Sequence, residues 1–270
     1  MPKIKVDQSF KQFLTPALAA VIESGQILLE QYKKFDRKTI KLKSKYEIVT
    51  AADWLSEKII LAQLKKKFPD HSFLSEEAGA SKNVSEYLWV LDPLDGTTNF
   101  SFHNPIWAIS LALVYRGRPV LGIVNAPALA ELYTAIEGDG AYLNKQKIVV
   151  SRFNKAKAIN AFCSGYGSAD IRRGLRYYAA VKEKGLDCRS LGSAALELCY
   201  LAAGRVESLV IPGTRAWDVA AGVVIVAEAG GRVTDFYDQH WRLTDRDIAA
   251  SNGKLHSEIL KIIQNSGTHL

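Results

Sequence analysis

Residues 92–99 read Asp-Pro-Leu-Asp-Gly-Thr-Thr-Asn and follow a short apolar run that is typical of a buried β-strand. The octapeptide therefore places two carboxylates, Asp92 and Asp95, three residues apart at the end of a strand. Pro93 fixes the backbone between them. Gly96 permits a tight turn and leaves backbone amides free to face an anion.

A helix that begins at Thr97 would direct its first N–H groups toward a phosphate. Carboxylates beside a phosphate need cations to offset their mutual repulsion, and magnesium prefers hard oxygen ligands and substrate phosphates. A pair of such ions can activate water and stabilise the leaving oxygen. The stretch predicts a metal-dependent phosphate site; the alternative is an acidic turn with Asp and Thr helix caps.

Two further segments carry carboxylates that could join this site. Residues 75–79, Ser-Glu-Glu-Ala-Gly, follow a short apolar pair and could supply one ligand and one supporting carboxylate, or lie in solvent. In residues 217–222, Trp-Asp-Val-Ala-Ala-Gly, Asp218 opens an apolar helix as an N-cap or as a ligand at a cleft. The small residues after it indicate close packing, which favours the ligand.

A fourth segment, residues 47–53, contains Glu47 and Asp53 on either side of a short apolar run. Asp53 is expected to be the N-cap of the following helix. Glu47 has no evident structural role.

The remaining pattern predicts a mixed α/β architecture, because antiparallel strands come first and helices and strands alternate later. Helical spacing of apolar residues predicts helices over 10–34, 52–68, 171–184, 194–203 and 218–229. Extended segments are expected at 40–50, 73–74, 87–92, 109–115, 120–125, 131–137, 141–143, 188–191, 208–211 and 233–236.

The composition is that of a globular protein, with 48% hydrophobic and 23% charged residues. No uncharged apolar stretch approaches 18 residues and no secretory signal is visible, so we expect no membrane partner. The three cysteines, Cys163, Cys188 and Cys199, form neither a disulfide framework nor a metal-ligand spacing. A reduced cytoplasm is the expected location.

The net charge of +7 is concentrated in two basic runs, residues 33–45 and 65–67. Such runs could attract anionic substrates or nucleic acid. They lack the interleaved aromatic residues of a single-strand binding surface, which favours a solvated basic face.

The four segments together resemble the inositol monophosphatase family of lithium-sensitive, magnesium-dependent phosphatases, in the family's order and at about its spacing. The resemblance covers almost the whole chain. It implies a five-layer α-β-α-β-α sandwich and a homodimer. Residues 1–150 would form an N-terminal half with an antiparallel sheet and most metal ligands. Residues 151–270 would form a C-terminal α/β half carrying Asp218, in one compact unit with the first.

The resemblance also implies two or three Mg²⁺ ions held by oxygen ligands. These ligands would be Glu76, Asp92, the backbone carbonyl of Leu94, Asp95 and Asp218. Asp92 would be shared by the first two ions, and Glu76 would contribute to the first and to a third, weaker one.

The same resemblance assigns the chemistry around the ions. Gly96 and Thr97 would contact the phosphate. Thr97, paired with the carboxylate of Glu47, would orient or deprotonate the attacking water, with Glu76 supporting catalysis through its ion. Residues Gly192, Ser193 and Ala194 resemble a substrate-side loop, whereas residues 164–168 match the family poorly and receive no role.

The chain departs from the family at positions that bear on activity. Glu47 replaces the usual Asp, and Ser75 replaces a usual Gly. Ile211, seven positions before Asp218, stands where inositol-selective members carry an acidic residue that binds ring hydroxyls. Loss of a hydroxyl acceptor lowers selectivity for a polyol. Arg215 is expected either to contact a second anionic group or to lie on the surface.

These expectations favour hydrolysis of a small phosphate monoester, either inositol monophosphate or a related sugar or polyol phosphate. Fructose 1,6-bisphosphate, histidinol phosphate and a 3′-phosphonucleotide are alternative substrates for the same chemistry. A different class of function is also open, because some bacterial relatives bind transcription machinery or RNA. The presence of every expected metal ligand argues against a purely scaffolding role.

Overall fold

The computed structural model describes residues 10–42, 48–154, 158–165 and 167–270. Its larger sheet has eight strands in the order β10-β9-β8-β7-β6-β5-β3-β4, all neighbours antiparallel except β3 and β5. The strands are β3 (Ser72–Ser75), β4 (Gly79–Ala80), β5 (Tyr87–Asp95), β6 (Ala108–Tyr115), β7 (Arg118–Ala126), β8 (Glu131–Ile136), β9 (Gly140–Leu143) and β10 (Gln146–Ile148).

The smaller sheet has five strands in the order β12-β11-β13-β15-β14. Its first three are parallel, and β15 is antiparallel to both its neighbours. The strands are β11 (Ile159–Phe162), β12 (Asp187–Arg189), β13 (Ser208–Pro212), β14 (Arg232–Thr234) and β15 (Asp247–Ser251). A separate short pair joins β1 (Lys41–Leu42) to β2 (Ile48–Val49).

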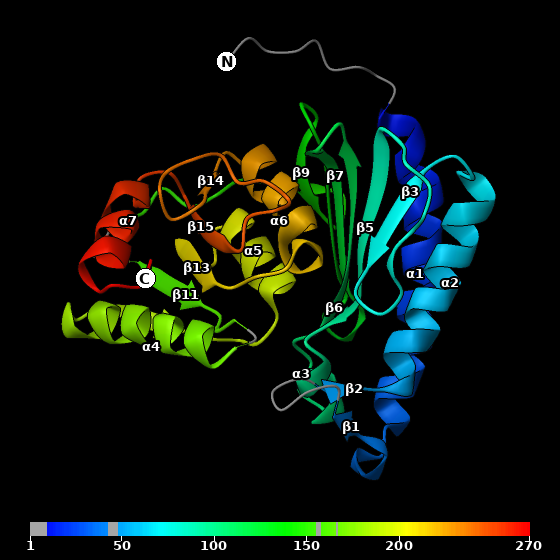
Figure 1. Ribbon diagram of the computed structural model, residues 1–270, viewed down its shortest axis with the longest axis horizontal. Helices are drawn as coiled ribbons and strands as arrows, with labels where there is room; N and C mark the ends of the chain where they lie inside the picture. Colours follow the sequence, from blue (N-terminus) through cyan, green and yellow to red (C-terminus); the bar gives the residue numbers. More distant parts are fainter. Residues whose placement is uncertain (1–9, 43–47, 155–157, 166) are drawn as a thin grey trace.

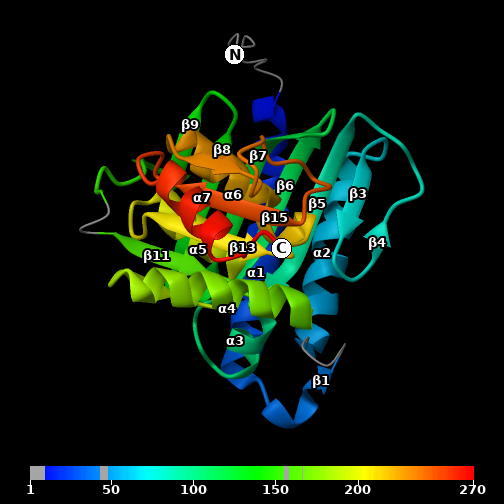
Figure 2. The same cartoon turned by 60° about the vertical axis from the view of Figure 1, so that its left-hand side comes forward.

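Helices separate and cover these sheets. They are α1 (Lys11–Lys34), α2 (Ala51–Lys67), α3 (Thr97–Ser101), α4 (Ser168–Glu183), α5 (Ala194–Ala202), α6 (Ala216–Glu228) and α7 (His256–Asn265), with short 3-10 turns at Arg37–Thr39 and Pro127–Leu129. The pair α1 and α2 covers the outer face of the large sheet, α5 and α6 lie between the sheets, and α4 and α7 cover the small sheet (Figures 1 and 2). The five-layer α-β-α-β-α sandwich is confirmed.

Three buried apolar clusters correspond to the interfaces between these layers. The first joins α1 and α2 to the large sheet through residues such as Phe13, Leu64 and Trp89. The second lies around α5 and α6, and the third lies beneath α4 and α7. Burial of apolar area in these clusters is the main favourable term in folding.

Helix α1 is long and apolar enough, by length and composition alone, to cross a membrane. Its buried residues recur at helical spacing, for example Phe13, Ala17, Ala20, Val21 and Leu28. This stripe packs against α2 and β7. The helix therefore serves here as one outer layer of the core.

Most expected elements are confirmed, with differences at their ends. Strand β5 extends through Asp95, with a register shift against β6 between Asp92 and Asp95. The sequence pattern did not predict β4, β10, β11, β15 or α7. The large sheet comes from residues 72–148 and the small sheet from residues 159–251; the division into halves at residue 150 stays a prediction.

Close approach of α6 to the large sheet depends on small residues, as residues 220–222 predicted. A Cβ atom on Gly122 of β7 would lie 2.4 Å from the carbonyl oxygen of Ala221 of α6. On the side of α6 that packs against α5, a Cβ atom on Gly222 would lie 2.4 Å from Leu198 Cδ1. Both distances are shorter than non-bonded atoms allow. Because Asp218 lies on α6, this packing also sets the position of a predicted ligand.

We expect Gly122→Ala to lower the free energy of unfolding by about 1–3 kcal/mol, because the contacting atom belongs to backbone that cannot move alone. Urea denaturation measures the change. Gly174→Ala is the matched control. Gly174 lies within α4, and a Cβ atom there would be 3.5 Å from its nearest neighbours, which is an ordinary van der Waals contact. There, alanine should stabilise the helix by about 0.5–1 kcal/mol. Equal stability of the two variants would contradict the packing described.

Candidate active site

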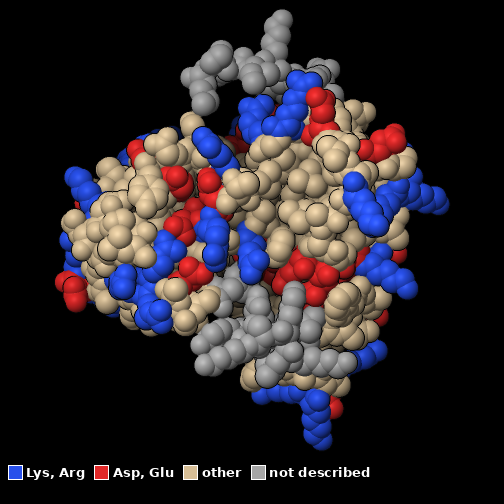
Figure 3. Space-filling view, in the orientation of Figure 1, with Lys and Arg blue, Asp and Glu red and all other residues tan. Residues whose placement is uncertain are grey.

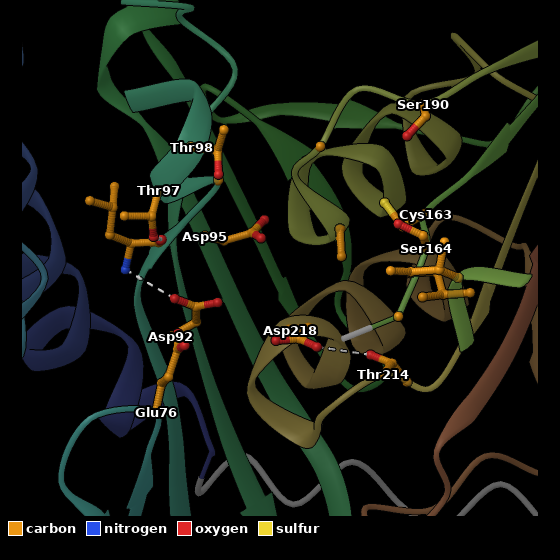
Figure 4. Close-up of a pocket in the computed structure, with 17 residues that line it drawn as sticks. Glu76, Asp92, Asp95, Thr97, Thr98, Cys163, Ser164, Ser190, Thr214 and Asp218 are labelled. Atoms are coloured by element: carbon orange, nitrogen blue, oxygen red, sulfur yellow. Dashed lines mark hydrogen bonds between the residues drawn. The ribbon is translucent and has the colours of Figure 1, made fainter. Parts of the chain in front are cut away.

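A pocket of about 390 Å³ opens between residues of β5 and α3 on one side and residues of α5 and the start of α6 on the other. Its described lining comprises Glu76, Asp92, Leu94, Asp95, Gly96, Thr97, Thr98, Cys163, Ser164, Gly165, Ile171, Ser190, Gly192, Ala194, Ile211, Thr214 and Asp218. Glu76, Asp92 and Asp95 lie on one wall, and Asp218 and Thr214 lie on the facing wall (Figure 4). The fold thus brings the four predicted carboxylate ligands, and Leu94, from three distant segments to one pocket.

The two aspartates of the octapeptide are held in different ways. Asp92 is buried, and its Oδ1 accepts a hydrogen bond from the backbone N–H of Leu94 at 3.0 Å. Asp95 Oδ2 accepts bonds from the Ser193 hydroxyl and, at 2.9 Å, from the Ala195 N–H. The strand end fixes the first carboxylate, while the beginning of α5 fixes the second.

Asp218 lies at the third position of α6, so it is not the N-cap, which was one of the two roles open to it. The helix begins at Ala216 and Arg215 is its N-cap residue. Asp218 Oδ2 accepts hydrogen bonds from the Arg215 N–H at 2.8 Å and the Thr214 hydroxyl at 3.2 Å. A carboxylate at this position satisfies an N–H that the helix leaves unbonded.

Burial and crowding make ionisation of these carboxyl groups unfavourable. Burial raises the pKa of Asp92 well above its usual range, and the charges of Glu76, Asp95 and Asp218 raise it further. Burial raises the pKa of Asp95 to about 6, although hydrogen bonds from Ser193 and Ala195 oppose the shift. No lysine or arginine is among the described residues of the lining. A bound cation would supply the missing positive charge.

The donor set fits magnesium by its chemistry, since it offers hard carboxylate oxygens and a backbone carbonyl at the pocket wall. Within the described part of the chain, however, no three His, Cys, Asp or Glu side chains are gathered tightly enough to enclose an ion as they stand. Each aspartate is instead oriented by its own protein donors. Such partners orient metal ligands in metal sites.

Gly96 and Thr97 form the turn that the octapeptide predicts. Gly96 has φ +86°, a conformation that favours glycine, and a Cβ there would lie 2.8 Å from the Ile106 carbonyl oxygen. The Thr97 hydroxyl lies 2.9 Å from the Leu94 carbonyl oxygen and 3.1 Å from Asp53 Oδ1. Its expected partner Glu47 is outside the described residues, so their pairing stays a prediction.

The sequence reading missed the role of Asp53. Thr50, not Asp53, is the N-cap of α2, and Asp53 closes a capping box by accepting the Thr50 N–H at 2.8 Å. Its other oxygen faces Thr97. Burial raises the pKa of Asp53 to about 7. The Thr-x-x-Asp spacing was the available signal for the cap, but no local pattern indicates the contact with Thr97.

The predicted substrate-side residues divide into three groups. Gly192, Ala194 and Ile211 line the pocket. Ser193 is buried and its hydroxyl donates to Asp95, so it supports a predicted ligand. Arg215 is exposed and outside the lining, with its guanidinium carbon 5.8 Å from the centre of the Trp217 ring; its predicted contact with substrate remains a prediction.

Several lining residues were not foreseen from the sequence: Thr98, Cys163, Ser164, Gly165, Ile171, Ser190 and Thr214. Residues 164–168 were given no role, yet Ser164 and Gly165 form part of the wall. The turn between β11 and α4 brings them to the pocket. The family resemblance places a substrate loop at this position, but the poor match of residues 164–168 left them without a predicted role.

A buried carboxyl group lies behind the pocket wall. Glu197 of α5 is fully buried and accepts hydrogen bonds from the Leu191 N–H and the Cys163 thiol. Burial raises the pKa of Glu197 to about 8. The Glu197 carboxyl group therefore links the loop before α5, through Leu191, to the segment after β11, through Cys163.

Because the pKa of Glu197 is raised in the folded state, its contribution to stability is fully present below about pH 4.5. That contribution is lost as the pH rises from about 4.5 to about 8. We compare the free energy of unfolding of the wild-type protein with that of Glu197→Gln. The wild-type value should fall relative to the variant's by a few kcal/mol across that window, since each pKa unit corresponds to about 1.4 kcal/mol. Urea unfolding at pH 5 and pH 8.5 measures it. Glu183→Gln, at an exposed site on α4, is the control. The same stability difference between wild type and Glu197→Gln at both pH values would contradict a raised pKa for Glu197.

Comparison with known proteins identifies the family. The model of the Inositol monophosphatase family matches residues 10–268. The Nus factor SuhB of Pasteurella multocida is 38% identical over 255 residues, which cover 93% of this chain and 95% of that protein. The fructose-1,6-bisphosphatase/inositol-1-monophosphatase of Thermotoga maritima is 36% identical over 239 residues, covering 88% and 91%.

The fold comparison gives the same result. The structure of an inositol monophosphatase from Anabaena (Nostoc) superposes with a TM-score of 0.84 at 32% identity, covering 96% of this chain and 97% of that one. The matched family makes this protein a phosphatase by class. The chain belongs to the inositol monophosphatase family.

Proposed function

We propose that the protein hydrolyses a small phosphate monoester with the help of Mg²⁺. The observation that carries the proposal is the convergence of Glu76, Asp92, Asp95 and Asp218 on one pocket beside the Gly96–Thr97 turn. Bound magnesium ions would lower the pKa of a water nucleophile and offset charge on the phosphate and the leaving oxygen. The oxygens of these side chains and the Leu94 carbonyl would hold two or three ions.

The chain's own residues would position the reactants. The Gly96 turn brings its backbone close to the pocket, where the N–H groups at the start of α3 can bind phosphate oxygens. The Thr97 hydroxyl, fixed beside Asp53 and the Leu94 carbonyl, would orient the attacking water. Glu47 would assist it, as the family resemblance implies.

The substrate we propose is a sugar or polyol phosphate. Ile211 and Ile171 give part of the wall an apolar character, while Ser164, Ser190 and Thr214 offer hydroxyl groups. An apolar wall leaves a ring hydroxyl without a partner, so inositol 1-phosphate should be less favoured than in a pocket with a carboxylate at position 211. The relative from T. maritima is named for both fructose-1,6-bisphosphatase and inositol-1-monophosphatase activity.

The direct test is phosphate release, with and without Mg²⁺, from inositol 1-phosphate, fructose 1,6-bisphosphate, histidinol phosphate and 3′-phosphoadenosine 5′-phosphate. We expect Mg²⁺-dependent turnover of at least one of them. Ile211→Glu should raise kcat/KM for inositol 1-phosphate relative to the others. Turnover that is indifferent to chelation of divalent cations, or none on any substrate, would count against the proposal.

We further propose inhibition by Li⁺, a homodimer and a cytoplasmic location. The first two rest on membership of the family. The location is supported by the state of Cys163, Cys188 and Cys199, which are all buried free thiols, as suits a reducing compartment. Inhibition by LiCl and the mass in solution by light scattering test the first two.

A second candidate function is association with the transcription machinery, because the relative from P. multocida is named Nus factor SuhB. On the face in Figure 3, Lys and Arg side chains are interspersed with Asp and Glu rather than gathered in one basic stripe. The described residues of this face therefore offer no continuous basic track for an RNA backbone. RNA affinity that falls steeply with salt would instead indicate phosphate contacts.

A further inference from the structure

The first two turns of α2 carry three buried polar side chains. Asp53, Ser56 and Glu57 have exposed fractions of 2%, 0% and 5%. Buried polar groups destabilise a fold unless they are hydrogen-bonded, and a buried carboxylate more than a hydroxyl. A helix in an outer layer does not need buried polar side chains for packing. The hydrogen-bond partners of these three residues therefore indicate their role.

Asp53 and Ser56 bind the octapeptide that contains two predicted ligands. Asp53 Oδ1 accepts from the Thr97 hydroxyl at 3.1 Å, and the Ser56 hydroxyl donates to the Pro93 carbonyl oxygen at 2.7 Å. Both contacts lie within the backbone segment that runs from Asp92 to Thr97. The helix therefore fixes this segment from behind, on the side away from the pocket.

Glu57 binds the other segment on this wall, the turn between β3 and β4. Its Oε1 accepts hydrogen bonds from the Ser75 hydroxyl, the Glu77 N–H at 3.2 Å and the Ala78 N–H at 3.1 Å. These three donors surround Glu76 in the sequence. The Glu76 N–H itself donates to the Leu91 carbonyl oxygen of β5 at 3.2 Å.

We propose that Glu57 is a positioning residue for the cation site: it holds the turn of residues 75–78 so that the Glu76 carboxylate faces the pocket. Asp53 and Ser56 hold the neighbouring segment, Asp92 to Thr97, in register with it. One helix face thereby sets the spacing between Glu76 and the Asp92–Thr97 segment. The inference rests on the proposed function in that it requires a divalent cation to bind there.

The test is Mn²⁺ binding to the substrate-free protein, measured by electron paramagnetic resonance, with melting temperatures recorded in parallel. Partners that orient metal ligands typically contribute 10–100-fold in affinity. We therefore expect Glu57→Ala to weaken Mn²⁺ binding by about that factor. Glu57→Gln should restore part of the affinity, because its amide oxygen still accepts hydrogen bonds, though less strongly than a carboxylate.

Leu64→Ala is the matched control, since Leu64 is buried on the same helix but packs in the outer apolar cluster. It should lower the melting temperature and leave Mn²⁺ affinity unchanged. Wild-type affinity in Glu57→Ala, or an equal loss in Leu64→Ala, would overturn the proposal.

Three further outcomes have a defined meaning. Should Glu57→Ala fail to fold, Glu57→Gln decides: several-fold weaker binding supports the proposal and unchanged binding overturns it. A wild-type protein that binds no Mn²⁺ overturns the proposed cation dependence, and this inference with it. Mn²⁺ binding without any phosphate release would leave the positioning role intact and remove only the proposed reaction.

Discussion

Asp95→Asn is expected to reduce kcat/KM for Mg²⁺-dependent phosphate release by more than about 100-fold, since loss of a partner that merely orients a ligand already lowers activity 10–100-fold. The amide keeps the size of the side chain and one acceptor for the Ser193 hydroxyl and Ala195 N–H. It removes the negative charge that a cation needs. The fold should survive, and the stability should change little or increase, because a buried charge is lost.

The measurement is phosphate release over a Mg²⁺ titration. Asp187→Asn makes the same chemical change on the edge strand β12, where the Asp187 side chain is 58% accessible, and should keep wild-type activity. An Asp95→Asn protein that retains more than about a tenth of the activity would show that this carboxylate is not required for binding the catalytic cation.

Thr97→Val should lower kcat on the order of 100-fold, the low end of what a positioned proton-transfer group contributes. Valine has nearly the same shape, so α3 and the Gly96 turn should persist. The variant loses only the hydroxyl held beside Asp53 and the Leu94 carbonyl. The Mg²⁺ concentration for half-maximal activity should stay the same, since the Thr97 side chain is not a predicted ligand.

Steady-state kinetics over a Mg²⁺ titration separate the two effects. Thr97→Ser, which keeps the hydroxyl, should recover most of the lost rate. A valine variant within about threefold of wild type, or a serine variant as slow as valine, would contradict a role for the hydroxyl in orienting water.

The octapeptide shows how much of the site the sequence can predict. Its apolar run, its aspartates and its Gly-Thr turn are local features, and the structure has them as β5, a carboxylate-lined wall and the start of α3. The five layers followed from the family resemblance. Helical spacing also placed α1 and α2 correctly to within a residue or two.

Contacts between distant segments were not accessible in this way. Glu57 lies 18 residues from Ser75 in sequence, and nothing local to α2 marks it as a partner of that turn. Strands β11 and β15 have four and five residues, too short for periodicity to separate strand from helix. Helix α7 did carry a signal, because Ile259, Ile262 and Ile263 recur at helical spacing.

The most direct test of the account is a crystal structure with Mn²⁺, located by anomalous scattering. The account predicts at least two ions in the pocket, with Asp92 bridging them and Asp95 and Asp218 on the second. Glu76 and the Leu94 carbonyl should bind the first. Anomalous peaks only outside the pocket, or none in a protein that releases phosphate in the same buffer, would contradict the claim that these carboxylates form the catalytic metal site.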